Sequence, residues 1–228
     1  MQNISSLPCS VPLINPSLLA ADFAHLERDI RSLEQAGAEI LHLDIMDGHF
    51  VPNFSFGIPV VEAIRRTTAL PLDVHLMLQN PEPYLPAFRK AGADFLSIHI
   101  EVVPDPRSMF DAIRKLGAIP GLVSNPPTPV EAVLPFVQDC ELILTMSVMP
   151  GFGGQAFDPV ALDKIRRIRE VAGENKLISV DGGIGDTTIA GAAAAGANLF
   201  VTGSALLGHP DIATQFRLLQ QRANLGRQ

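Results

Sequence analysis

The chain has little cysteine and no long hydrophobic segment. Its two cysteines, Cys9 and Cys140, lie far apart without metal-ligand spacing, so we expect a reduced, cytoplasmic setting. No apolar run approaches the roughly 20 residues that cross a bilayer. The N-terminal stretch MQNISSLPCSVPLINPS lacks the basic and apolar regions of a secretory signal. These absences argue against a membrane or secreted protein.

Positive charge is also scarce. The formal net charge is −7, and the 17 Lys and Arg residues form no basic cluster. This argues against nucleic acid or an anionic membrane as a partner, and an anionic substrate would need a locally positive site. Hydrophobic residues make up 47% of the chain, enough for a sizeable core. Because no linker-like tract divides the sequence, we expect a single domain over residues 1–228, with residues 1–10 as a short N-terminal extension.

Short β-like runs alternate with amphipathic helical stretches along the whole sequence. AGAEILHLD, AGADFLSIH and AGANLFVTG share one signature, in which a glycine ends a helix just before a strand. The eight strand candidates cover residues 11–17, 39–45, 70–77, 94–100, 118–124, 141–147, 176–181 and 198–203. Eight such units predict the α/β class and a (β/α)₈ barrel. The alternative is an open doubly wound sheet, but no G-x-G-x-x-G turn follows the first strand.

Ionisable side chains collect at the C-terminal ends of the predicted strands, where barrels of this kind carry their chemistry. His42 and Asp44 share one strand face in LHLDIMDGHFVPN, His75 lies in the next strand, and Asp181 ends the seventh. Singly, such a histidine is usually a core residue and such an aspartate a turn residue. Together they are costly to bury unless a cation neutralises them. The set suits one divalent metal ion: zinc, iron(II), manganese or cobalt.

Three glycine-rich segments follow the last three strands. They are GFGG at 151–154, DGG at 181–183 and GS at 203–204, and none contains Lys or Arg. The last strands of a barrel frequently bind phosphate through backbone N–H groups and a helix N-terminus. Glycine loops are also ordinary turn chemistry, so the segments alone leave both interpretations open.

These motifs, taken together, resemble the ribulose-phosphate 3-epimerases. PSLLAADF, LHLDIMDGHFVPN, LDVHLM, SVMPGFGGQAF, VDGG and GSAL occur in order from Pro16 to about Leu206, which is nearly the whole chain. The pairing of the second and third motifs is specific. The related barrel decarboxylases of the orotidine-phosphate type have D-x-K-x-x-D at the third strand, whereas this chain has His75 in place of the lysine.

The resemblance implies a TIM barrel of the ribulose-phosphate-binding type and an isomerase of the pentose phosphate pathway. Its substrate would be a sugar phosphate: D-ribulose 5-phosphate and D-xylulose 5-phosphate would be interconverted at C3 through an enediolate. His42, Asp44, His75 and Asp181 would be metal ligands, and Asp44 and Asp181 would also be the acid/base pair. The implied substrate contacts are Ser17, His75, Met46, Met77, Met146, Gly151, Phe152, Gly153, Gly154, Gly182, Gly183, Gly203 and Ser204. The three methionines would line the reacting carbons, and the glycine segments would hold the phosphate.

The sequence departs from the family pattern at three positions. Met149 stands where Asn is common, Ser179 where Glu is usual, and Ala20 where Ser is frequent. None of these removes an implied ligand, but they leave room for a six-carbon substrate such as allulose 6-phosphate. For His99 and Glu101, at the fourth strand, we expect a supporting role rather than a catalytic one.

Two other classes of function fit the sequence less well than an epimerase. A Schiff-base aldolase needs a lysine near the C-terminal end of a strand, and the sequence offers none there. A non-catalytic phosphosugar-binding or metal-storage barrel would explain the glycine segments and the ligands, but not one carboxylate on each side of a planar site. No interface is legible in the sequence, and we expect a homo-oligomer because family members are commonly oligomeric.

Overall fold

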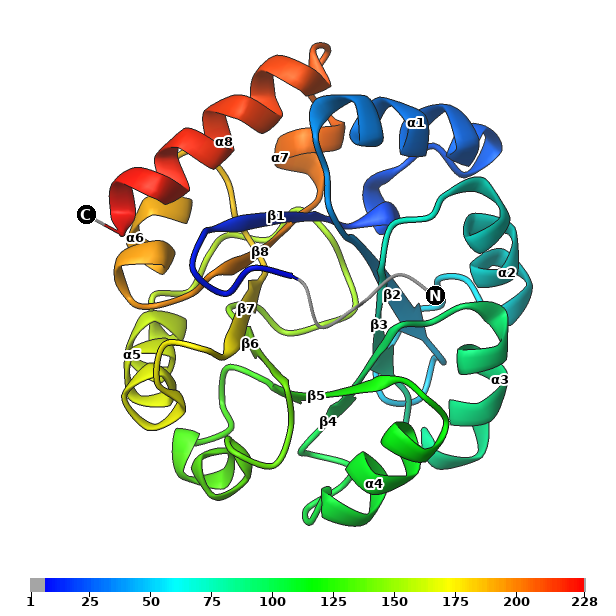
Figure 1. The fold of residues 1–228 in the computed structure, drawn as a ribbon, viewed down its shortest axis with the longest axis vertical. Helices are drawn as coiled ribbons and strands as arrows, with labels where there is room; N and C mark the ends of the chain where they lie inside the picture. Colours follow the sequence, from blue (N-terminus) through cyan, green and yellow to red (C-terminus); the bar gives the residue numbers. More distant parts are fainter. Residues whose placement is uncertain (1–6, 228) are drawn as a thin grey trace.

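The computed structural model describes residues 7–227, in which eight parallel strands follow the order β1-β8-β7-β6-β5-β4-β3-β2. A bridge between Ser17 and His42 joins the two outer strands of this order, β1 and β2, and closes the barrel (Figure 1). The strands are β1 Leu13–Pro16, β2 Leu41–Met46, β3 Leu72–Met77, β4 Phe95–His99, β5 Ile119–Ser124, β6 Leu142–Met146, β7 Leu177–Asp181 and β8 Leu199–Thr202. The predicted (β/α)₈ barrel and all eight predicted strands are confirmed, and the open sheet is excluded.

Helices form a shell around the strands (Figure 1). The α-helices are α1 Leu26–Ala36, α2 Ile58–Thr67, α3 Leu85–Ala91, α4 Arg107–Lys115, α5 Val160–Ala172, α6 Ile189–Ala194, α7 Ser204–Leu207 and α8 Ile212–Gly226. Short 3₁₀ helices supplement them: η2 Leu18–Ala20, η3 Phe23–His25, η4 Glu82–Tyr84, η5 Val130–Ala132 and η6 Leu134–Phe136. No described helix is long and apolar enough to span a membrane.

The connection between β5 and β6 departs from the expected alternation of strands and helices. It contains the two 3₁₀ helices η5 and η6 where an α-helix was expected. Its sequence, NPPTPVEAVLPFVQD, holds four prolines. Proline lacks the N–H that an α-helix needs and disfavours helical geometry in the residue before it, so only short turns form here.

The glycine signature before three of the strands is confirmed. Gly37, Gly92 and Gly196 have φ angles of 103°, 118° and 111°, a region that residues with a Cβ rarely adopt. At Gly92, an added Cβ would also lie 2.4 Å from the side chain of Arg65. These glycines let each helix end abruptly and turn directly into the next strand.

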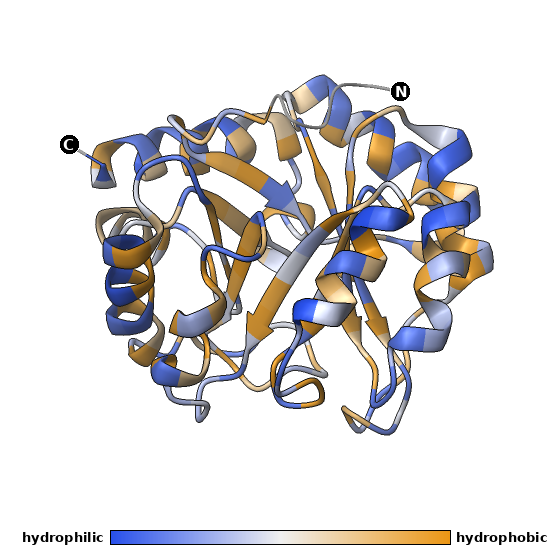
Figure 2. Cartoon of the chain, turned by 60° about the horizontal axis from the view of Figure 1, so that its bottom comes forward, coloured by the Kyte–Doolittle hydropathy of each residue, from blue (hydrophilic) through white to orange (hydrophobic). Residues whose placement is uncertain are grey.

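Apolar side chains fill the barrel and the space between strands and helices. The strands are largely hydrophobic, whereas hydrophilic and hydrophobic residues alternate along the helices (Figure 2). Near the N-terminal ends of the strands, Leu13, Phe95, Leu142 and Leu199 belong to one cluster, against which Leu7 packs. Residues 1–6 of the predicted extension, and residue 228, lie outside the described part of the chain. The single domain over 1–228 therefore stays a prediction.

Candidate active site

Two histidines and two aspartates meet at the C-terminal ends of the strands. His42 and Asp44 lie in β2, His75 in β3, and Asp181 ends β7. One potential ligand atom from each of the four residues lies within 4.8 Å of the others. The parallel register pairs Asp44 directly with His75. The structure thus brings together all four residues proposed as ligands from the sequence.

Both imidazole rings turn one nitrogen toward Asp44. His42 Nε2 lies 3.2 Å and His75 Nδ1 3.1 Å from Asp44 Oδ1. His42 Nε2 is buried and makes no hydrogen bond within residues 7–227. An unpaired ring nitrogen next to a carboxylate is costly to bury, and a divalent cation would satisfy it. The four donors therefore fit a metal ion.

The two aspartates differ in their electrostatic environment. Burial disfavours the charge of Asp44, but His42 and His75 outweigh this effect and lower its pKa below the usual range. For Asp181, burial and then repulsion from Asp44 raise the pKa to about 6. One carboxylate is thus ionised while the other can hold a proton near neutral pH. This is the division found in acid/base pairs of enzymes.

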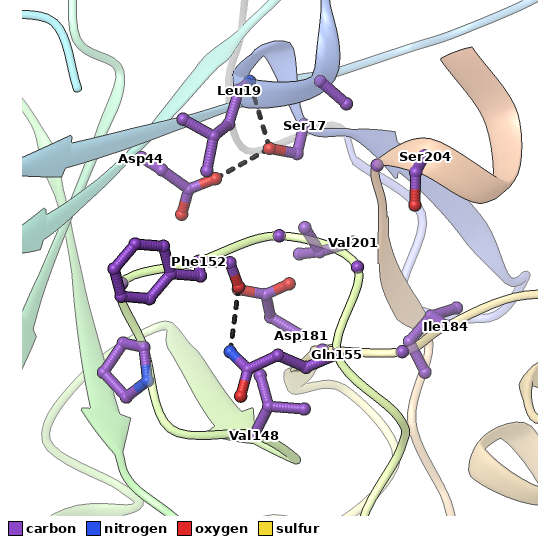
Figure 3. Close-up of a pocket in the computed structure, with 18 of the residues that line it drawn as sticks. Ser17, Leu19, Asp44, Val148, Phe152, Gln155, Asp181, Ile184, Val201 and Ser204 are labelled. Carbon is purple, nitrogen blue, oxygen red and sulfur yellow. Dashed lines mark hydrogen bonds between the residues drawn. The ribbon is translucent and has the colours of Figure 1, made fainter. Parts of the chain in front are cut away.

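A cavity of about 580 Å³ opens beside the two aspartates, and both of them line it (Figure 3). Ser17 precedes η2 and donates from its Oγ to Asp44 Oδ2 at 2.7 Å. Twelve proposed substrate-contact residues line the cavity: Ser17, Met46, Met77, Met146, Gly151, Phe152, Gly153, Gly154, Gly182, Gly183, Gly203 and Ser204. The thirteenth, His75, is fully buried and does not line it.

Three methionines form an apolar wall next to the aspartates. Met46, Met77 and Met146 are each the last residue of their strand and are at least 94% buried, with exposed fractions of 6%, 1% and 2%. Met146 is paired with Asp181 in the register of β6 and β7. Thioether side chains carry no N–H or O–H group, so this wall offers no competing proton donor.

The glycine segments lie on the cavity wall as well. Gly182 has a φ of 108°, and a Cβ there would lie 2.6 Å from the Val148 side chain, so no larger residue fits. Among the described residues that line the cavity there is no Lys or Arg. An anion in this cavity would therefore depend on backbone N–H groups and on the hydroxyls of the wall.

The role of Gln155 was not predicted from the sequence. Its amide donates to the carbonyl oxygens of Met149 and Phe152, at 2.8 Å each, and so ties the β6–α5 loop to itself (Figure 3). The glutamine stands in the motif SVMPGFGGQAF, but its residue type alone does not reveal that it braces the loop. Met149 itself is exposed.

The support of His42 was also missed. His42 Nδ1 lies 2.8 Å from Asp73 Oδ2, and Asn15 Nδ2 donates to the same oxygen at 2.8 Å. All three side chains are fully buried. A signal was present, because Asp73 lies two residues before His75 and so faces the barrel interior with it.

The departures from the family pattern have plain structural positions. Ala20 lines the cavity. Ser179 is fully buried, and its Oγ has no hydrogen-bond partner in the described part of the chain. No hydrogen bond from Ser179 therefore supports Asp181.

Active sites of (β/α)₈-barrel enzymes lie at the C-terminal ends of the strands, where the two carboxylates are found, and fold and site assign the chain to that class. Within this class, it belongs to the ribulose-phosphate 3 epimerase family, whose family model matches residues 13–207. The family resemblance seen in the sequence is confirmed.

Similar proteins agree with this assignment. The chain is 47% identical to the ribulose-phosphate 3-epimerase of Bacillus subtilis over 202 residues, covering 87% of this chain and 93% of that protein. It is 40% identical to the enzyme of the same name from Methanocaldococcus jannaschii, with 92% and 90% covered. A rice relative, 45% identical over 86% of this chain and 87% of that protein, is named as a cytoplasmic isoform.

Solved structures with low sequence identity share the fold. KGPDC from Streptococcus mutans superposes with a TM-score of 0.70 at 12% identity, over 94% of this chain and 98% of that one. A tryptophan synthase alpha-subunit from Pyrococcus furiosus gives a TM-score of 0.66 at 16% identity, over 94% and 96%. These likenesses concern the barrel alone.

Proposed function

We propose that the chain is a ribulose-phosphate 3-epimerase, an isomerase that interconverts D-ribulose 5-phosphate and D-xylulose 5-phosphate. The observation that carries the proposal is the pair Asp44 and Asp181, which both line a cavity of about 580 Å³, a volume typical of small-molecule sites (Figure 3). Relatives that carry this enzyme name are 40% to 47% identical over most of the chain. They favour the pentulose phosphate over a six-carbon substrate.

Asp44 and Asp181 are the acid/base pair that acts at C3 of the substrate. Epimerisation removes the proton next to the carbonyl from one face of the sugar and returns a proton to the other face. One carboxylate accepts the proton on its own face of the sugar, and the other delivers a proton from the opposite side. In the reverse direction the two residues exchange roles. Ser17 holds Asp44 Oδ2 in place, which keeps that carboxylate aimed at the cavity.

His42, Asp44, His75 and Asp181 would hold one divalent cation, either zinc, iron(II), manganese or cobalt. When bound, the cation supplies electrostatic stabilisation for negative charge that develops on the substrate oxygens during proton removal. His42 and His75 each present a ring nitrogen on the Asp44 side, and the methionine wall keeps water away from the reacting carbons.

The phosphate of the substrate binds to the glycine segments at residues 151–154, 182–183 and 203–204. No Lys or Arg lies on the described cavity wall, so the backbone N–H groups of these segments supply the positive potential for the phosphate. We further propose a cytoplasmic, homo-oligomeric enzyme of the pentose phosphate pathway. The rice relative named as a cytoplasmic isoform supports the location.

An epimerisation assay combined with elemental analysis tests this function. Purified protein loaded in turn with each of the four metals is given D-ribulose 5-phosphate and, separately, allulose 6-phosphate, and kcat/KM is compared. We expect turnover of the pentulose phosphate with one bound metal per chain. A protein that holds its metal but inverts neither sugar would contradict the proposal and favour a non-catalytic binding barrel.

A further inference from the structure

A chain of hydrogen bonds leads from His75 away from the cavity. His75 Nε2 and His99 Nε2 lie 2.8 Å apart, and His99 Nδ1 lies 3.0 Å from Glu101 Oε2. Both imidazoles are fully buried, and their rings stack with centroids 5.0 Å apart. Neither His99 nor Glu101 lines the cavity. This chain of hydrogen bonds therefore reaches the candidate metal site through His75.

Glu101, at the outer end of this chain of hydrogen bonds, is an ionised hydrogen-bond acceptor. Glu101 Oε1 accepts from the backbone N–H of Asn125 at 2.8 Å and from the hydroxyl of Thr128. Burial raises the pKa of Glu101, but hydrogen bonds from His99, Thr128 and Asn125 lower it to about 2, so the carboxyl group is ionised at neutral pH. The loop of Asn125 is itself held by Lys164 of α5, whose Nζ donates to the carbonyls of Asn125 and Pro126 at 2.7 Å each. Glu101 is thus anchored at a fixed position.

The acceptor at Glu101 determines where the protons of both rings lie. Because Glu101 only accepts, His99 Nδ1 must carry the proton that it donates. A neutral His99 then has a lone pair on Nε2. The contact of 2.8 Å between the two Nε2 atoms needs one N–H, which must therefore belong to His75. His75 Nδ1, which faces Asp44, is left with a free lone pair.

We propose that Glu101 and His99 are positioning residues, which fix the proton of His75 on Nε2 so that its Nδ1 lone pair points at the candidate cation site. This rests on the proposed metal ligation by His75. His42 needs the opposite tautomer, with the proton on Nδ1, and receives it directly from the contact with Asp73. The two candidate ligands thus present different nitrogens, and a separate carboxylate sets each one.

Nuclear magnetic resonance of the full chain tests the proton positions. Long-range ¹H–¹⁵N spectra of zinc-loaded protein with ¹⁵N-labelled histidine distinguish the tautomers directly. We expect the proton on Nε2 of His75 and on Nδ1 of both His42 and His99. A proton on Nε2 of His99 would overturn the proposal, and this measurement needs no variant that could fail to fold.

Zinc affinity provides the second test, by competition with a chromophoric chelator. His99→Phe keeps a ring against Phe50, whose centroid lies 4.5 Å from that of His99, but removes the acceptor for His75. We expect His99→Phe and Glu101→Ala to weaken zinc binding about 10- to 100-fold. Glu101→Gln retains an oxygen that can accept from His99, so most of the affinity should return.

Ser97→Ala is the matched control. Ser97 is fully buried on the same strand, two residues before His99, and its Oγ makes no hydrogen bond to any described residue. The zinc affinity of the Ser97→Ala variant should stay within about twofold of wild type. If Glu101→Ala and His99→Phe bound zinc as tightly as Ser97→Ala, the proposal would be wrong. Because no turnover is measured, a failure of the proposed epimerase activity would be seen separately in the sugar assay.

Discussion

Ser17 Oγ donates to Asp44 Oδ2 at 2.7 Å, which joins the end of β1 to a carboxylate on β2. The oxygen that accepts is not the one near the two histidines, because His42 Nε2 and His75 Nδ1 both approach Oδ1. Asp44 therefore has one oxygen directed to the cation site and one held by a neutral hydroxyl.

Ser17→Ala should lower activity without removing the metal. The variant deletes a hydrogen bond to a buried charged group, which typically contributes about 1.5–3 kcal/mol. We expect kcat to fall about 10- to 100-fold while zinc content stays close to wild type, and the lost hydrogen bond should also lower the melting temperature. Steady-state kinetics and elemental analysis measure both. A large loss of metal would show that the hydroxyl supports ligation instead.

His42→Ala and His75→Ala should each lose most of the bound cation and most of the activity. Each removes one of the four clustered donors, and in each the barrel should persist because its apolar core is unchanged. Metal content by elemental analysis and secondary structure by circular dichroism are the measurements. Full metal retention with unchanged turnover would rule out the metal assignment.

Asp44→Asn and Asp181→Asn should separate the two halves of the proton transfer. Each variant keeps one carboxylate, so in deuterated water each should wash deuterium into C3 of one epimer, and the two should select opposite epimers. Epimerisation itself should fall by at least about 10²- to 10⁴-fold. Mass spectrometry of the recovered sugars is the measurement, with metal content determined alongside. Exchange of the same epimer by both variants would indicate a single base.

Bulky residues at Gly153 or Gly203 should raise KM far more than Ser204→Ala. An added Cβ at Gly153 meets no atom within 4 Å, and at Gly203 the nearest is Ala20 Cβ at 3.5 Å, so the fold should tolerate both. The new side chain would nevertheless obstruct close approach of the phosphate to the backbone. Removing the Ser204 hydroxyl should weaken the free energy of substrate binding by about 1 kcal/mol, the contribution of one hydrogen bond. If replacing a Lys or Arg of the chain by a neutral residue abolished phosphate recognition, binding of the phosphate by the backbone would be refuted.

Glu101 should make stability depend on pH in acid. Burial raises its pKa, but hydrogen bonds from His99, Thr128 and Asn125 prevail and lower the pKa to about 2, against 4.5 ordinarily. A lowered carboxyl pKa contributes stability above pH 4.5 that is lost as the pH falls toward 2. Urea unfolding of wild type and Glu101→Gln across this range should show the difference between them shrinking as the pH falls. A constant difference would contradict the shift.

Local patterns were sufficient to predict the strands and the cluster of ligands. Residues of alternating polarity give the inward face of β2 and β3, and the barrel topology brings their ends and that of β7 together. The β5–β6 connection was not predicted in detail, although its prolines explain the absence of an α-helix. The contact of His99 with His75 could not be predicted, because it depends on ring orientations that packing alone determines.

The register of β1 with β8, in which Leu13 pairs with Leu199, has a consequence for how the protein is made. The two ends of the chain must meet before the barrel is complete, and contacts between such distant segments form slowly. A chain still emerging from the ribosome holds His42, Asp44 and His75 but not Asp181, and later still it lacks the strand that joins its first one. The pair Asp44 and Asp181 is therefore complete only when the first seven strands have been made.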